Sequence, residues 1–359
     1  MHRIEIRYDT GGRSVDESTT KILLIDVDSI IPNIALMKLS THYKQKGDSV
    51  SLMRLGIPIY HPTKKPTVID CKDFDMVHIS AIFNGTLANI EFANSVFDIG
   101  GSGVDLQKKL PEEIESLPCD YDLYSGCGMD ENTAYGFISR GCIRNCFFCI
   151  VRQKEGDLHQ VSTIDKVLQG KKQVKFFDNN FLALPNHIEL LQELLKKNIK
   201  CQFNQGLDLR LITHHNALLI SKLNHIGEVY FAFDDWKNRK IISEQMRIVR
   251  EYIVNEWKVK MFLYCSPDMD IATEVYPRIM WCKHNYVLPY FMRDLKCWSA
   301  KNKGDYADLS CWCNQPNIFK PMTYEQFYDK RHPKNKGNYP EWYSRVDKTD
   351  LYADEQERL

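Results

Sequence analysis

The stretch SRGCIRNCFFCIVRQ, residues 139–153, contains three cysteines in the pattern C-x-x-x-C-x-x-C. Cys142, Cys146 and Cys149 are close enough along the chain for their thiolates to bind one face of a 4Fe-4S cluster. Because such a cluster has four irons, three cysteines leave one iron open to a substrate or cofactor, as in open catalytic metal sites. The pattern therefore predicts a catalytic iron–sulfur site rather than an electron-transfer site.

Charged residues surround these cysteines. Arg140, Arg144 and Arg152 flank them, and their positive charge would help to stabilise an anionic thiolate cluster. A zinc site is the alternative, but it normally needs a fourth cysteine or histidine, which His159 could supply.

The cysteine stretch follows YGFISRG (135–141), the first of six segments that read as buried strands. The other five lie at 173–181, 199–207, 227–234, 258–265 and 285–292. Amphipathic stretches, notably 187–198 and 215–226, separate them and favour helices. This alternation predicts an open six-stranded (β/α) barrel over 126–295, although a doubly wound sheet accommodates it too. In such folds the active site lies at the carboxyl ends of the strands.

Polar side chains follow the second, third and fourth strand segments, in FFDNNF (176–181), FNQGLDLRL (203–211) and FAFDDW (231–236). The candidate site residues are Asp178, Asn179, Asn180, Asn204, Gln205, Asp208, Arg210, and Asp234 or Asp235. Polar turns, surface ion pairs and helix capping are alternative explanations for the same residues.

Residues 1–125 predict a separate, smaller sheet. Strand-like runs at 21–30, 49–56, 75–83 and 97–103 alternate with helical stretches at 32–47 and near 86–96. This β-α-β alternation is typical of a parallel sheet of Rossmann type. A polar lead-in precedes the first strand, and a polar connector over 104–135 follows the last.

The C-terminal segment 296–359 is rich in aromatic residues, Asn, Lys and Pro. Its composition predicts an irregular extension that caps the barrel. The aromatic residues expected to form this cap are Trp298, Trp312, Phe319, Tyr324 and Phe327.

The 359-residue chain has 47 basic and 47 acidic residues, so its formal net charge is zero. That balance provides no bulk attraction to nucleic acids or membranes.

No apolar run approaches the roughly 18 residues of a transmembrane helix, and the N-terminus does not look like a signal peptide. We therefore expect a cytoplasmic protein without membrane contact, in which the 12 cysteines favour metal ligation over disulfides.

The pattern C-x-x-x-C-x-Φ-C, with Phe148 at the aromatic position, resembles the radical S-adenosylmethionine (radical SAM) superfamily. The resemblance implies that Cys142, Cys146 and Cys149 bind a 4Fe-4S cluster, whose open iron chelates the amino and carboxylate groups of SAM. One electron from a flavodoxin- or ferredoxin-type donor then cleaves the S–C5′ bond, and the resulting 5′-deoxyadenosyl radical abstracts hydrogen from a substrate. Phe148 would lie near the adenine. The resemblance covers roughly residues 135–295 and is most specific at the cysteines.

The resemblance also implies cofactor contacts at the strand ends. Members of the superfamily bind the SAM amino group at the end of the second strand, often with Gly-Gly-Glu, where this chain has Asp178, Asn179 and Asn180. These residues supply acceptors for an ammonium group, and the sequence leaves open which one makes the contact. Arg210 would pair with the SAM carboxylate, and Asp234 or Asp235 would meet the ribose or the substrate.

A Rossmann-like domain ahead of such a barrel is similar to the cobalamin-binding group of the superfamily. Those domains often carry D-x-H-x-x-G, whose histidine binds cobalt, whereas DVDSIIPN (26–33) contains no histidine. The domain is expected either to bind cobalamin without that ligand or to be a degenerate form that shapes the substrate pocket.

Other functions stay open. A cobalamin-dependent methyltransferase differs from the leading interpretation by one cofactor. A methylthiotransferase needs three more N-terminal cysteines, a pattern that Cys71, Cys119 and Cys127 match poorly. A non-catalytic iron–sulfur or zinc protein is the third alternative. The substrate, whether peptide, modified nucleotide or lipid, cannot be named from the sequence.

A second cluster is a further hypothesis. Its ligands would be Cys297, Cys311 and Cys313, with Cys282 supplied from elsewhere. Because C-x-C alone is a poor spacing for a cube, packed or reactive cysteines near the substrate explain these residues equally well.

Overall fold

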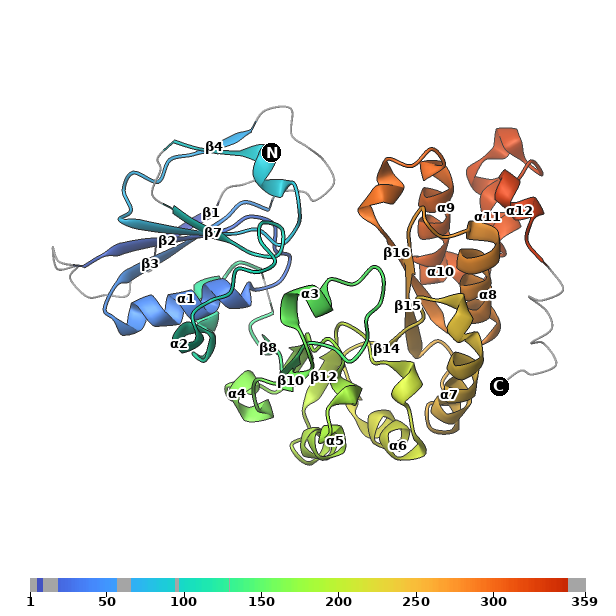
Figure 1. Cartoon of the computed structure of the whole chain (residues 1–359), viewed down its shortest axis with the longest axis horizontal. Coiled ribbons are helices and arrows are strands. Elements are labelled where there is room, and N and C mark those ends of the chain that lie inside the picture. Colours follow the sequence, from blue (N-terminus) through green and yellow to red (C-terminus); the bar gives the residue numbers. More distant parts are fainter. Residues whose placement is uncertain (1–4, 9–18, 57–65, 94–96, 129, 348–359) are drawn as a thin grey trace. The chain divides into compact units, whose positions relative to one another are not determined.

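The computed structural model describes residues 5–8, 19–56, 66–93, 97–128 and 130–347 (Figure 1). The chain divides into two compact units. The first comprises Met1–Gly136, Phe148–Gly156 and Asp165–Lys171, and the second Phe137–Phe147, Asp157–Ile164 and Lys172–Leu359. Both contain helices and parallel sheets, so the expected α/β class is confirmed. The domain boundaries expected from the sequence stay predictions.

A five-stranded sheet in the order β1-β3-β2-β5-β7 forms the first unit. The strands β2, β3, β5 and β7 are parallel, as expected, and β1 joins β3 in antiparallel orientation from within the polar lead-in. The bounds are β1 (Glu5–Tyr8), β2 (Lys21–Asp26), β3 (Ser49–Arg54), β5 (Met76–Ser80) and β7 (Phe97–Gly100).

Apolar side chains cover both faces of this sheet. Ile22 and Leu24 of β2 pack with Leu36 and Met37 of helix α1 (Ile34–Gln45), while the alternating residue Leu23 joins a second core on the opposite face. This alternation follows from the two-residue period of a strand. The residue before the helix, Asn33, caps it, because its side chain accepts a hydrogen bond from the Leu36 nitrogen.

The prediction of a helix near 86–96 is wrong for the described residues. The 3-10 turn η1 (Thr86–Asn89) is followed by strand β6 (Ile90–Phe92), which pairs in parallel with β4 (Thr67–Ile69). The side chain of Ile90 is buried in the same core as Ile69, so tertiary packing outweighs local helical preference here. Residues 94–96 lie outside the described part. The remaining elements are α2 (Glu112–Glu115), η2 (Tyr121–Tyr124), β8 (Thr133–Gly136), α3 (Val151–Glu155) and α4 (Ile164–Leu168).

Two parallel sheets form the second unit. One contains β11 (Gln173–Phe176), β12 (Lys200–Phe203) and β13 (Asn224–His225), the other β14 (Val229–Ala232), β15 (Val259–Cys265) and β16 (Leu288–Arg293). A parallel bridge between Leu207 and Phe231 links them. The long strands therefore follow one another in chain order, without the reversal of a doubly wound sheet. The described strands do not close into a barrel.

Helices return the chain between these strands (Figure 1). They are α5 (His187–Lys196), α6 (His214–Lys222), α7 (Arg239–Tyr252) and α8 (Tyr276–His284). In α7, Ile242, Met246 and Val249 are buried, at the spacing that places them on one helical face. Because each helix separates parallel strands, the loops after the strands gather at one edge of the sheets. The short antiparallel pair β9 (Ser139–Arg140) and β10 (His159–Gln160) completes this region.

The expectation of an irregular C-terminal extension is wrong for its described residues. That segment contains η7 (Leu295–Trp298), α9 (Lys303–Cys313), α10 (Pro316–Phe319), α11 (Tyr324–Arg331), η8 (Pro333–Asn335) and α12 (Glu341–Ser344). Trp312, Phe319 and Tyr324 are fully buried and Phe327 is nearly so, whereas Trp298 is exposed. Aromatic packing, such as the 5.5 Å contact between the rings of Trp312 and Tyr324, therefore orders these short helices. Residues 348–359 lie outside the described part.

Candidate functional site

The cysteine-bearing loop begins beside the carboxyl end of β11. Ile138 and Ser139 donate their backbone nitrogens to the carboxylate of Asp178, at 3.1 and 2.6 Å, and the Ser139 hydroxyl donates to it at 2.7 Å. Burial raises the pKa of Asp178 to about 6, against the lowering effect of these hydrogen bonds. Asp178 therefore fixes the start of the loop.

The next two residues continue this pattern along the loop. The Asn179 side chain accepts a hydrogen bond from the Gly141 nitrogen at 3.0 Å. The Asn180 amide nitrogen donates to the sulfur of Cys142 at 3.6 Å. Consecutive side chains at 178–180 thus hold consecutive parts of the loop from 138 to 142.

A buried carboxylate, Asp208, connects the loop to the end of β12. It accepts hydrogen bonds from Nε of Arg144 at 3.0 Å, from Nε of Arg210 at 2.7 Å and from the Asn180 amide at 3.3 Å. It also caps the 3-10 turn η4 (Leu209–Leu211) by accepting from the Arg210 nitrogen. Burial alone would raise the pKa of Asp208, but the hydrogen bonds and charges of the two arginines hold it below its usual value.

Asp234 follows β14 at the same edge of the sheets. Its carboxylate accepts a hydrogen bond from the Tyr264 nitrogen at 2.9 Å. Burial raises its pKa, although the charges of Arg278 and Arg210 oppose the rise. The ring of Phe147, from the cysteine loop, meets the ring of Tyr264 edge-on at 6.0 Å. These contacts bring the loop and the ends of β14 and β15 together.

The sulfur of Cys142 accepts hydrogen bonds from the Asn180 amide and from the backbone nitrogen of Arg144, the latter at 3.3 Å. Donors of this kind suit a thiolate that ligates iron, because hydrogen bonds to the sulfurs tune such clusters. Cys142 and Cys146 are half-buried in the second unit, while Phe148 and the exposed Cys149 belong to a segment of the first. Among the described residues, no three His, Cys, Asp or Glu side chains are already arranged around a metal position.

Among the described residues at this edge, one buried acceptor lacks a hydrogen-bond partner. It is Oδ1 of Asn180, whose amide nitrogen contacts both Cys142 and Asp208. An unpaired buried amide oxygen is costly, so it is a place where a ligand donor is expected. The donor set therefore fits a cluster carrying a ligand with an N–H or ammonium group next to Cys142.

Asn204 and Gln205 lie in the turn after β12, as the sequence predicts, and the Asn204 nitrogen donates to the Phe176 oxygen at 2.8 Å. Within the described residues, neither of their side chains makes a hydrogen bond. The sequence did not predict the links from Ser139 to Asp178 and from Arg144 to Asp208. The only signal for them is the presence of acidic residues at strand ends, which also marks helix caps.

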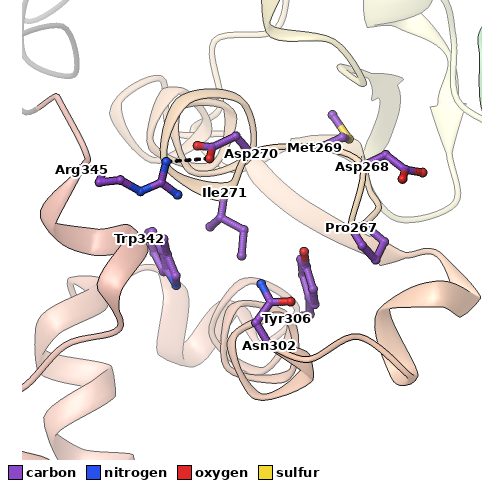
Figure 2. Close-up of a pocket in the computed structure, with 9 residues that line it drawn as sticks. All are labelled: Pro267, Asp268, Met269, Asp270, Ile271, Asn302, Tyr306, Trp342 and Arg345. Carbon is purple, nitrogen blue, oxygen red and sulfur yellow. Dashed lines mark ion pairs between the residues drawn. The ribbon is translucent and has the colours of Figure 1, made fainter.

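A cavity of about 360 Å³ lies beside the loop after β15, away from the cysteine loop in the sequence (Figure 2). Its lining includes Asp268, Asn302, Tyr306 and Trp342, and the ion pair between Asp270 and Arg345 at 2.8 Å. Because Asp270 also caps the π-helix η6 (Ile271–Val275), its charge is already paired within the protein. The lining does not specify a ligand class.

Hydrogen bonds and close backbone packing connect the loops after β2, β5 and β7. Asp28, in the loop after β2, accepts hydrogen bonds from the nitrogens of Ile82 and Phe83 and from the Thr86 hydroxyl. A Cβ atom at Gly101 would come within 2.2 Å of the Ala81 oxygen, so the turn after β7 packs tightly on the loop after β5. The Asp28 carboxylate is therefore paired internally, whereas Nε of Arg54, at the end of β3, has no hydrogen-bond partner among the described residues. The described part of the loops at this edge contains no histidine that could bind cobalt. Cobalamin binding by this unit stays a prediction from the sequence resemblance.

The remaining C-terminal cysteines pack in the protein. Cys297 donates its thiol to the Cys265 oxygen at 3.5 Å, and both are buried. Cys282 and Cys313 are buried as well, and Cys311 is half-buried. Burial raises the pKa of Cys313 well above its usual value, which favours the neutral thiol of a packed residue.

No protein-family model and no curated protein matches this chain. Within the described residues, no helix has both the length and the apolar character needed to cross a lipid bilayer.

Proposed function

We propose that this protein is a radical SAM enzyme that reductively cleaves SAM and starts radical chemistry on a substrate not yet identified. The observation that carries the proposal is the buried, unpaired Oδ1 of Asn180, next to the sulfur of Cys142 at the end of β11. The cysteine pattern leaves one iron open, to which SAM would bind. The buried acceptor beside Cys142 would accept a hydrogen bond from the SAM ammonium group.

The residues that would hold the cluster are Cys142, Cys146 and Cys149. The hydrogen bonds to Cys142 and the guanidinium groups of Arg144 and Arg210 would offset part of the negative charge of the Cys142 and Cys146 thiolates. When bound, the reduced cluster supplies the one electron that breaks the S–C5′ bond of SAM, giving methionine and a 5′-deoxyadenosyl radical. A flavodoxin- or ferredoxin-type donor would deliver that electron in the cytoplasm, where we place the protein.

The protein's own residues would bind and orient SAM. Asn180 would accept a hydrogen bond from the SAM ammonium group, because its amide oxygen is buried and has no partner in the described part of the chain. Asp178 and Asn179 would contribute indirectly, because their side chains accept hydrogen bonds from the backbone of the cysteine loop. Arg210 would pair with the SAM carboxylate while Asp208 fixes its guanidinium group.

The sheet arrangement is compatible with this function. The strands β11, β12, β14, β15 and β16 follow chain order, as in a partial (β/α) barrel, and the candidate residues follow their carboxyl ends. We propose that the second unit is an open radical SAM barrel and that Asp234 faces the ribose or the substrate.

Metal and sulfide analysis tests the proposal. Protein purified without oxygen should hold about four irons and matching sulfide per chain. Replacing Cys142, Cys146 and Cys149 by Ala should remove them. A matched control replaces Cys119, Cys127 and Cys311, which are half-buried cysteines outside the motif, and should retain the iron. Wild-type protein with one zinc and no sulfide would contradict the proposal.

A further inference from the structure

Asp208 makes more contacts than a helix-capping residue needs. Capping of η4 uses one bond, from the Arg210 nitrogen to Oδ1 at 3.2 Å. The same carboxylate also accepts from Nε and Nη2 of Arg210, at 2.7 and 3.1 Å, and from Nε of Arg144 at 3.0 Å. A bidentate arginine pair and a second arginine therefore share one carboxylate whose side chain is only 7% exposed.

The two arginines come from different parts of the chain. Arg144 lies between Cys142 and Cys146 in the loop, and its nitrogen donates to the sulfur of Cys142. Arg210 follows β12. Burial would lower its pKa, but Asp208 and, after it, the charge of Cys146 raise it. Asp208 therefore pairs directly with two positive groups beside the cysteines.

We propose that Asp208 is a positioning residue that fixes Arg144 and Arg210 beside Cys142 and Cys146, and so holds the cysteine loop in its iron-binding form. This inference rests on the proposed function. Like-charged guanidinium groups would repel each other without the carboxylate between them. The loop would then lose its link to the end of β12, and Arg144 would no longer hold the segment between the two cysteines.

The rate at which iron is lost to a ferrous chelator tests this role. It is measured without oxygen on the full chain with its iron bound. Asp208→Asn keeps the size of the side chain and one capping acceptor but removes the charge. Loss of a charge-assisted hydrogen bond should accelerate iron release about tenfold. Arg144→Gln should have a similar effect, because it removes the other partner of the same contact.

A double-mutant comparison separates positioning from general stability. If Asp208 acts through Arg144, the variant that combines Asp208→Asn and Arg144→Gln should release iron no faster than Asp208→Asn alone. Asp270→Asn is the matched control, since Asp270 also caps a helix and pairs with an arginine in the same unit. It should lower the unfolding temperature without changing the rate of iron release. Should Asp208→Asn fail to fold, Arg144→Gln alone provides the test, with faster iron release expected at an unchanged unfolding temperature.

The outcomes are distinct. Equal release rates for wild type and Asp208→Asn would overturn the inference, as would multiplied effects in the double variant, because independent sites are additive. If only Arg144→Gln can be measured, an unchanged rate would overturn it. Wild-type protein that binds no iron would reject the proposed function itself and this inference with it.

Discussion

Ser139 donates both its backbone nitrogen and its hydroxyl to one oxygen of Asp178, at 2.6 and 2.7 Å. Both residues are almost fully buried. The Asp178 carboxylate, two residues after β11, therefore determines the backbone position from which the cysteine loop starts.

The buried Asp178 carboxyl should make stability depend on pH. Its pKa in the folded protein, about 6, is above the value of about 3.9 for an unfolded chain, so the folded state binds the proton more tightly. Its contribution to stability is therefore fully present below about pH 4 and is lost as the pH rises through about 6. We expect the free energy of unfolding of wild type, relative to Asp178→Asn, to fall between about pH 4 and about pH 7. Urea titrations of both proteins across this range measure it, and a difference that does not change with pH would contradict the expectation.

Removing the unpaired acceptor at Asn180 should weaken SAM binding. A hydrogen bond to a charged group contributes about 1.5–3 kcal/mol, so Asn180→Ala should lower the affinity for SAM about tenfold or more. Equilibrium dialysis of cluster-loaded protein measures this loss. Asn314→Ala is a suitable control, because Asn314 bonds the nitrogen and oxygen of Phe291 on the edge strand β16. It should reduce stability and leave SAM affinity unchanged, and equal affinities for wild type and Asn180→Ala would exclude the proposed contact.

Arg144 should raise the reduction potential of the cluster. A nearby positive charge stabilises the reduced state, which is the more negative one. Arg144→Gln should therefore lower the midpoint potential in a redox titration followed by electron paramagnetic resonance. Arg345→Gln breaks a comparable pair with Asp270 and should not shift it. A potential that rises or does not move in Arg144→Gln would argue against this charge effect.

Much of the secondary structure of the second unit could be predicted, because the sequence patterns that indicate it are local. The three cysteines lie within one short stretch, and strand and helix patterns alternate clearly from 173 to 292. The position of Asp178, Asn180 and Asp208 after their strands follows from that alternation alone.

What those side chains contact could not be predicted. Arg144 and Asp208 are 64 residues apart, and their contact depends on how β12 is placed beside the loop. Asp178 likewise offers its carboxylate to backbone nitrogens, whose direction depends on the folded loop. From the sequence alone, a role in holding the loop and a role in binding SAM cannot be separated.

The prediction of an irregular C-terminal segment was wrong although a local helical pattern was present. Tyr306, Leu309 and Trp312 are buried at the three-residue spacing of a helix, so the signal for α9 was present. Frequent Asn, Lys and Pro around it suggested loops instead. The long-range aromatic packing that orders these short helices has no local pattern in the sequence.

The most direct test of the central claim is the fate of SAM in the reduced protein. Cluster-loaded protein, treated with a strong reductant in the absence of any substrate, should slowly release 5′-deoxyadenosine and methionine. The variant in which Ala replaces Cys142, Cys146 and Cys149 should release none. If protein with a full cluster forms no 5′-deoxyadenosine under these conditions, the account of this protein as a radical SAM enzyme is contradicted.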